Sequence, residues 1–242
     1  MYGRAMDEDV AAAKEGAWRE AAEIDGAFER GEIDAAGWHA AWLALVEPAY
    51  LGGDNPCAQS GMSGDAAGWE LARGLLLDAI PGDCTLLDVG CASGHLMESL
   101  VAWAAADGST IEPYGVDISA GLADLARRRC PRWADRIFNA NAATWRPPRR
   151  FDVVRTGLEY VPASHAGPYL RHLFDEVVAP GGRLIIGVYN EERDLSTTED
   201  RVRALGYAVT GRTARPHRHP AIAYKALWLD TPPVTAPPAR TP

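Results

Sequence analysis

The sequence has few cysteines, and those it has lie far apart. Cys57, Cys84, Cys91 and Cys130 include no C-x-x-C pair. Their spacing argues against a structural zinc site and favours a reducing compartment, because zinc sites and disulfide frameworks use cysteines in recognisable pairs. We therefore expect no bound metal and a cytoplasmic location.

Long apolar runs and an excess of positive charge are also missing. No stretch approaches the roughly 20 apolar residues of a membrane-spanning helix, and Met1–Asp9 has no apolar signal-peptide segment. Lys and Arg total 24 against 33 Asp and Glu, giving a net charge of −9. Binding to nucleic acid depends on Lys and Arg. We expect no membrane and no nucleic-acid partner, and either a monomer or a homodimer.

What is present is the pattern of a globular α/β protein. The 242 residues are 47% hydrophobic and 24% charged, which suits one α/β domain with an extension. Apolar strand-like runs alternate with helical stretches over residues 81–230, the predicted main domain. Residues 1–80 form a predicted helical extension. The Pro-, Thr- and Ala-rich residues 231–242 cannot bury apolar surface, and we expect a disordered tail.

Leu86–Gly94 is the most informative segment for function. An apolar run ends in Asp88, and Gly90 and Gly94 follow with the spacing G-x-x-x-G. The pattern predicts a strand, a tight turn and a helix start, with glycines that let a ligand approach the backbone. The next strand ends in Asp117, where a carboxylate can accept hydrogen bonds from ribose hydroxyls. Together they predict a ribose-bearing cofactor at the carboxyl edge of a parallel sheet.

The loop lacks the signatures of two common nucleotide sites. A dinucleotide fold uses G-x-G-x-x-G, but Ala92 stands where the middle glycine would be. The loop also has no lysine, so it does not match a nucleoside triphosphate loop. The spacing therefore disfavours a nicotinamide-dependent oxidoreductase.

Asp88–Gly94 resembles the D-x-G-x-x-x-G loop of class I S-adenosylmethionine-dependent methyltransferases. Gly115–Ser119, Phe151–Val154 and Ala179–Leu184 resemble three further segments of that family, in the same order. The resemblance is to small bacterial enzymes of secondary metabolism. It implies an α/β fold: a Rossmann-like, seven-stranded, mostly parallel sheet with a terminal antiparallel hairpin and an N-terminal helical cap.

The resemblance also implies which residues bind S-adenosylmethionine. Asp117 would hold the ribose hydroxyls, Ile118 would pack on the adenine face, and Asn141 would lie beside the adenine, where the family often has Asp. Cys91 is expected as a small apolar neighbour, not a nucleophile. The full expected set is Ser63, Asp88, Gly90, Cys91, Ala92, Gly94, Asp117, Ile118, Asn141, Ala142 and Thr156.

Candidate catalytic residues follow the strand Phe151–Arg155. Methyl transfer from a sulfonium is a direct displacement, and a base is needed only where the acceptor atom carries a proton that must leave. Glu159 or His165 would orient or deprotonate the acceptor, and Tyr160 would shape its pocket. The N/D-P-P-Y/F motif of nucleobase and protein-glutamine methyltransferases is absent after this strand, which disfavours those substrates.

The N-terminal extension is predicted to contain helices at Asp7–Arg30 and Asp34–Glu47, the second ended by Pro48. Trp38, Trp42 and Leu45 share one helical face. That face either packs on the main domain or walls an aromatic acceptor pocket.

A glycine-rich loop follows over residues 50–65. By resemblance, Gln59, Ser60 and Ser63 lie near the amino-acid end of the cofactor; alternatively, the loop only caps the helix Ala66–Ala79.

Near the carboxyl end we expect a helix at Gly167–Val178, a strand at Arg183–Tyr189 and a strand pair at Tyr207–Arg212 and Ala221–Leu229. The expected function is methyl transfer to a small, aromatic or heteroaromatic acceptor at oxygen, nitrogen or an indole carbon. A protein that binds S-adenosylmethionine without catalysis is the alternative.

Overall fold

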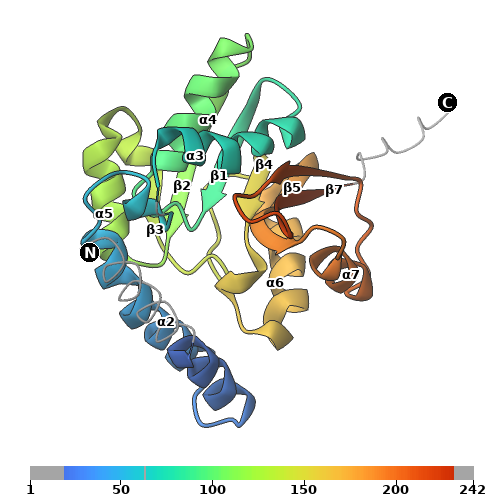
Figure 1. Ribbon diagram of the computed structural model, residues 1–242. Helices are drawn as coiled ribbons and strands as arrows, with labels where there is room; N and C mark the ends of the chain where they lie inside the picture. The colour runs from blue at the N-terminus through green and yellow to red at the C-terminus, as the bar shows by residue number, and fades with distance from the viewer. Residues whose placement is uncertain (1–18, 63, 232–242) are drawn as a thin grey trace, which may run out of the picture.

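The computed structural model describes residues 19–62 and 64–231 (Figure 1). It contains a seven-stranded sheet in the order β3-β2-β1-β4-β5-β7-β6. The strands are β1 Cys84–Val89, β2 Ile111–Asp117, β3 Ile137–Asn139, β4 Phe151–Thr156, β5 Val178–Glu192, β6 Gly211–Pro216 and β7 Ile222–Asp230.

The strands of the sheet pair in parallel except at β7. β1 pairs in parallel with β2 and β4, and β3 and β5 extend the parallel arrangement on the two sides. β7 runs antiparallel to both β5 and β6. This confirms the predicted Rossmann-like sheet with a terminal antiparallel hairpin. The strand order reverses beside β1, and ligands of open α/β sheets bind at such a switch point.

Helices cover both faces of the sheet (Figure 1). They are α2 Ala35–Leu51, α3 Ala66–Arg73, α4 His95–Ala106, α5 Ala120–Arg129, α6 Ala166–His172 and α7 Thr197–Ala204. Neighbouring residues of one strand enter different cores: Leu86 packs with the residues of α3 and α4, and Leu87 packs with those of α6. Both side chains are fully buried, as expected for a strand covered on both faces.

The predicted N-terminal helices are present in the described part of the chain. Residues 19–29 are helical, and α2 follows after a turn. The indoles of Trp38 and Trp42 both donate to Asp25 Oδ1, at 2.8 and 3.3 Å. These tryptophans therefore join the two cap helices to each other. The predicted helix residues before 19 and the predicted tail at 232–242 lie outside the described residues.

Pro48 does not end the second cap helix, contrary to the sequence prediction. It lies inside α2, which continues to Leu51. A proline here removes one backbone donor close to the helix end. The last turn still closes, because Gly52 N donates to Pro48 O at 2.9 Å.

The predicted boundaries near the carboxyl end were partly wrong. The strand predicted at Tyr207–Arg212 is instead β6, Gly211–Pro216, which extends into a basic segment that carries no strand pattern. β6 is an edge strand, and edge strands tolerate charge and a terminal proline. The helix predicted at Gly167–Val178 consists of α6 and a π-helical turn at Leu173–Val177.

β5 also begins earlier than predicted, at Val178 rather than Arg183. Its register with β4 shifts between Phe151 and Val153, so the Pro-Gly-Gly turn that follows Ala179 is absorbed as an irregularity of the strand. Within residues 19–62 and 64–231, no helix is long and apolar enough to cross a membrane.

Candidate cofactor and acceptor site

The glycine loop leaves β1 in a left-handed conformation. Gly90 has φ +70° and Gly94 has φ +77°, and Ala92 between them has φ +47°. Gly90 N and Cys91 N both donate to Val116 O, at 2.8 and 3.2 Å. These bonds fix the loop against the carboxyl end of β2.

The two glycines of the loop have different neighbours. A Cβ at Gly90 would come within 2.8 Å of Tyr160 Cζ, so only glycine allows the Tyr160 ring to pack against the loop. A Cβ at Gly94 would instead approach Cys130 Sγ at 3.0 Å and Ala126 Cβ at 3.4 Å. Gly94 therefore allows α5 to pack against the loop.

Asp117 lies at the end of β2, beside the loop. Its Oδ1 accepts from Ser119 N and its Oδ2 from Ala92 N, both at 2.8 Å. The residue is 7% exposed, and burial raises the pKa of its carboxyl group. Each oxygen keeps a second acceptor position. Two such positions on a buried carboxylate fit the vicinal hydroxyls of a ribose.

The expected adenine contacts surround the same edge. Ile118 is 39% exposed, although it is a large apolar residue. Asn141 and Ala142 follow β3, and Asn141 Oδ1 accepts from Ala143 N at 3.0 Å. Asn139, which the sequence pattern does not single out, donates to the carbonyls of Asp117 and Ile118 at 3.0 Å each. It therefore joins the ends of β2 and β3.

A buried arginine dominates the centre of the site. Arg155 Nη1 lies 3.2 Å from Asp88 Oδ1 and 3.0 Å from the Tyr160 hydroxyl. Its Nε donates to Gly187 O. Burial raises the pKa of Asp88 to about 6, and the Arg155 charge opposes that rise. Sequence reasoning gave Arg155 no role; its signal was a charged residue inside the apolar run of β4.

Arg73, at the end of α3, brings a second cation to this region. Its guanidinium lies 5.3 Å from the Trp69 ring. Burial lowers its pKa, the nearby Arg155 charge lowers it further, and Asp88 opposes both effects. Two arginines in one enclosed region suit an anionic group such as a carboxylate.

The N-terminal cap is hydrogen-bonded to this edge of the sheet. His39 Nε2 lies 3.1 Å from Tyr160 O, and the Ser119 hydroxyl donates to Glu47 Oε1. Ser60 Oγ lies 2.8 Å from Ser93 Oγ in the glycine loop. The cap therefore contacts the segments after β1, β2 and β4.

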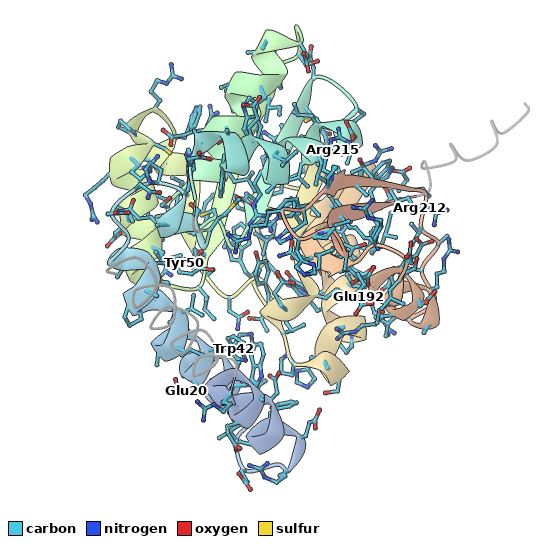
Figure 2. The ribbon with its side chains drawn as sticks, viewed as in Figure 1. Glu20, Trp42, Tyr50, Glu192, Arg212 and Arg215 are labelled. Atoms are coloured by element: carbon cyan, nitrogen blue, oxygen red, sulfur yellow. The ribbon has the colours of Figure 1, made fainter. Side chains whose placement is uncertain are left out.

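The remaining residues to locate belong to α2 and to the loop that follows it. In Figure 2, Tyr50 lies at the end of α2 nearest the sheet, and Trp42 lies farther along the helix. Ser63 lies outside the described residues, and Gln59 donates to Gly53 O within its own loop.

The three predicted catalytic residues all lie in the segment that follows β4. Tyr160 and Glu159 follow β4 directly, in a 3-10 turn at Leu158–Tyr160. The His165 ring instead packs edge-on against Phe28, at 5.2 Å between centroids, and the residue is exposed. The role of His165 as the alternative to Glu159 stays a prediction.

Two further expected cofactor contacts are buried. Thr156 is fully buried, and its hydroxyl lies 2.5 Å from that of Tyr169. Cys91 is buried, and burial raises its pKa well above the ordinary value, so it stays a thiol.

A cavity of about 230 Å³ opens next to Glu159. The turn that follows β4 and the interior residues Ile186–Tyr189 of β5 form one wall, and the first turns of α7 form the other. Its lining residues are Gly157, Leu158, Glu159, Ile186, Gly187, Val188, Tyr189, Thr197, Thr198 and Arg201. The cavity lies past the end of β4, where the sequence predicted the acceptor.

Comparison with known proteins agrees with this architecture. Residues 86–182 match the protein family described as a methyltransferase domain. No curated protein matches the sequence. The N-methyltransferase NodS of Bradyrhizobium japonicum, solved with S-adenosyl-L-homocysteine, is 18% identical, with a TM-score of 0.53 over 78% of this chain and 97% of that one.

Two further solved structures have similar scores. The 1,6-didemethyltoxoflavin-N1-methyltransferase of Burkholderia thailandensis is 16% identical, with a TM-score of 0.53 over 69% of this chain and 80% of that one. The [4+2]-cyclase SpnF is 17% identical, with a TM-score of 0.52 over 71% and 85%. At these identities the likeness shows the fold alone. The chain therefore has the fold of these methyltransferase structures, and its residues 86–182 match a methyltransferase domain, in agreement with the resemblance of Asp88–Gly94.

Proposed function

We propose that the protein transfers a methyl group from S-adenosylmethionine to a small-molecule acceptor. The observation that carries the proposal is the buried Asp117 carboxylate beside the Gly90 loop. Each of its oxygens has one backbone partner and one acceptor position left, a match for a ribose diol.

The residues present fit this cofactor. Asp117 would hold the ribose, Ile118 and Asn141 would flank the adenine, and Gly90 would meet the amino-acid portion. Arg73 offers an unpaired guanidinium for the carboxylate, since no hydrogen bond or ion pair to it is found among residues 19–62 and 64–231. When bound, S-adenosylmethionine supplies a methyl group on a sulfonium sulfur, which is a good leaving group.

Two similar structures support this cofactor and a small acceptor. The NodS structure holds S-adenosyl-L-homocysteine, and that of the toxoflavin enzyme holds S-adenosylhomocysteine together with 1,6-didemethyltoxoflavin. In this chain, Glu159 would orient the acceptor and accept its proton, and Tyr160 would shape the pocket. The acceptor atom is an oxygen, a nitrogen or an indole carbon.

Calorimetry tests the cofactor directly. Titration with S-adenosylhomocysteine should give a binding isotherm, and titration with NAD should give none. No heat with S-adenosylhomocysteine on folded protein would refute the proposal. If the product analogue binds but no acceptor in a broad panel of phenols, amines and indoles is methylated, the non-catalytic alternative holds.

A further inference from the structure

The charges around the cavity beside Glu159 indicate its ligand. We propose that the acceptor is a small amine that also carries a carboxylate, with its nitrogen at Glu159 and its carboxylate at Arg201. The inference rests on the proposed function and specifies its substrate class.

The size of the cavity limits the acceptor. Its volume of about 230 Å³ lies below the roughly 300–1,000 Å³ of pockets that hold drug-sized ligands. A compact molecule such as an amino acid fits within this volume.

Most charged groups near the α7 wall are already paired. Glu191 Oε2 lies 3.0 Å from Lys225 Nζ, and Glu191 Oε1 accepts from Thr198 N at 2.9 Å. Glu199 forms ion pairs with Arg203 and Arg212, each at 2.7 Å. None of these charged groups lines the cavity.

Glu159 and Arg201 are different. Among the described residues, no ion pair within 4.0 Å involves either of them. Arg201 Nη2 donates to Ala163 O at 2.9 Å, which leaves most of its N–H groups available. Both residues line the same cavity, so an acidic and a basic group remain available to one ligand.

This arrangement selects a zwitterion. A guanidinium binds a carboxylate through paired N–H groups, and a carboxylate accepts only, so it suits an ammonium or amine N–H. Tyr189 adds a neutral hydroxyl, because burial raises its pKa. A phenol or an indole would leave the Arg201 charge without a partner.

The chemistry balances with Glu159 as proton acceptor. The amine binds as the ammonium form and loses one proton to the Glu159 carboxylate, which passes it to solvent. The nitrogen lone pair then forms the new N–C bond as the carbon–sulfur bond breaks, and that electron pair goes to sulfur. The products are the N-methylated ammonium and neutral S-adenosylhomocysteine.

The test measures release of S-adenosylhomocysteine with the standard amino acids, their carboxamides and their decarboxylated amines. We expect at least one amino acid to be methylated with a kcat/KM about tenfold or more above that of its carboxamide. Arg201→Met should lower kcat/KM for the amino acid by about the same factor and leave the carboxamide unchanged. Arg201→Lys, which keeps the charge, should recover part of the loss.

Matched controls separate the cavity from general charge effects. Glu192→Gln and Arg128→Met alter exposed residues that do not line the cavity, and neither should change the selectivity. Equal losses for amino acid and carboxamide in Arg201→Met would overturn the inference, as would turnover of phenols or indoles without any amino acid. If either result is obtained and S-adenosylhomocysteine still binds in calorimetry, only the proposed amino-acid substrate is refuted. If S-adenosylhomocysteine does not bind, the proposed methyltransferase function is refuted as well.

Discussion

The ring of Tyr160 lies against the backbone of Gly90. A Cβ placed on Gly90 would be 2.8 Å from Tyr160 Cζ and 2.9 Å from its hydroxyl oxygen. The same hydroxyl accepts from Arg155 Nη1 at 3.0 Å, so the ring is held over the loop that the proposed cofactor must contact. A side chain at position 90 therefore has no room while Tyr160 stays in this position.

Gly90→Ala tests this contact. The new methyl group should both strain the backbone at φ +70° and collide with Tyr160, whereas Gly108→Ala at φ +80° meets open space. We expect Gly108→Ala to cost about 1 kcal/mol of unfolding free energy from the backbone alone. Gly90→Ala should cost more and should abolish the heat of S-adenosylhomocysteine binding. Urea unfolding and calorimetry measure the two effects; equal costs would show that Tyr160 is not held in place.

Asp117→Asn tests the proposed ribose contact. The dissociation constant for S-adenosylhomocysteine should rise about tenfold or more, because charge-assisted hydrogen bonds are stronger than neutral ones. The unfolding midpoint should also fall, because the amide nitrogen of Asn cannot accept from Ala92 N or Ser119 N, so one of these two buried donors loses its partner. Asp124→Asn, at an exposed residue paired with Arg127, is the matched control. Unchanged affinity in Asp117→Asn would remove the ribose role.

Arg155→Met tests the buried ion pair. It leaves the Asp88 carboxylate buried without its partner, and breaking such a pair costs about 3–5 kcal/mol. The double variant Arg155→Met with Asp88→Asn should be more stable than Arg155→Met alone. Chemical denaturation of the two single variants and the double variant gives the coupling energy. A coupling near zero would mean that the two side chains do not act on each other.

Glu199→Gln tests a charge network on α7. Hydrogen bonds from Arg203 and Arg212 lower the pKa of Glu199 below its ordinary value of 4.5, while burial opposes them. A carboxylate with a lowered folded pKa stabilises the protein above its unfolded pKa and loses that effect as the pH falls through the folded value. The variant should be about 1 kcal/mol less stable at neutral pH and should approach the parent in strong acid. Glu192→Gln, at an exposed position, should show no such convergence.

The sheet was predictable because its signals are local. Leu86–Val89 and Tyr114–Asp117 have the pattern of buried parallel strands, and polar residues mark the same edge of the sheet in both. The family resemblance then supplied the strand count and the terminal hairpin, which the structure confirms.

The boundaries that failed depend on pairing rather than on pattern. Gly211, the first residue of β6, pairs with Trp228, and a Cβ there would overlap the indole ring. The basic residues that follow, Arg212–Pro216, do not show the alternating apolar pattern of a strand. Pro48 looked like a helix end, but a single lost donor near the last turn of α2 is easily accommodated.

The centre of the site could be predicted only in part. Asp88, Gly90 and Asp117 are recognisable from spacing, but the partner of Asp88 comes from a strand 67 residues later in the chain. The contact of His165 with Phe28 depends on where the N-terminal helix of residues 19–29 lies, which the sequence does not indicate. Long-range packing of this kind leaves no periodic trace in the sequence.

The cap meets the sheet edge through hydrogen bonds that join His39, Glu47 and Ser60 to the distinct segments that carry Tyr160, Ser119 and Ser93. A hydrogen bond to a charged group contributes about 1.5–3 kcal/mol, more than a neutral one, so the Ser119–Glu47 contact should hold the cap more firmly than the other two.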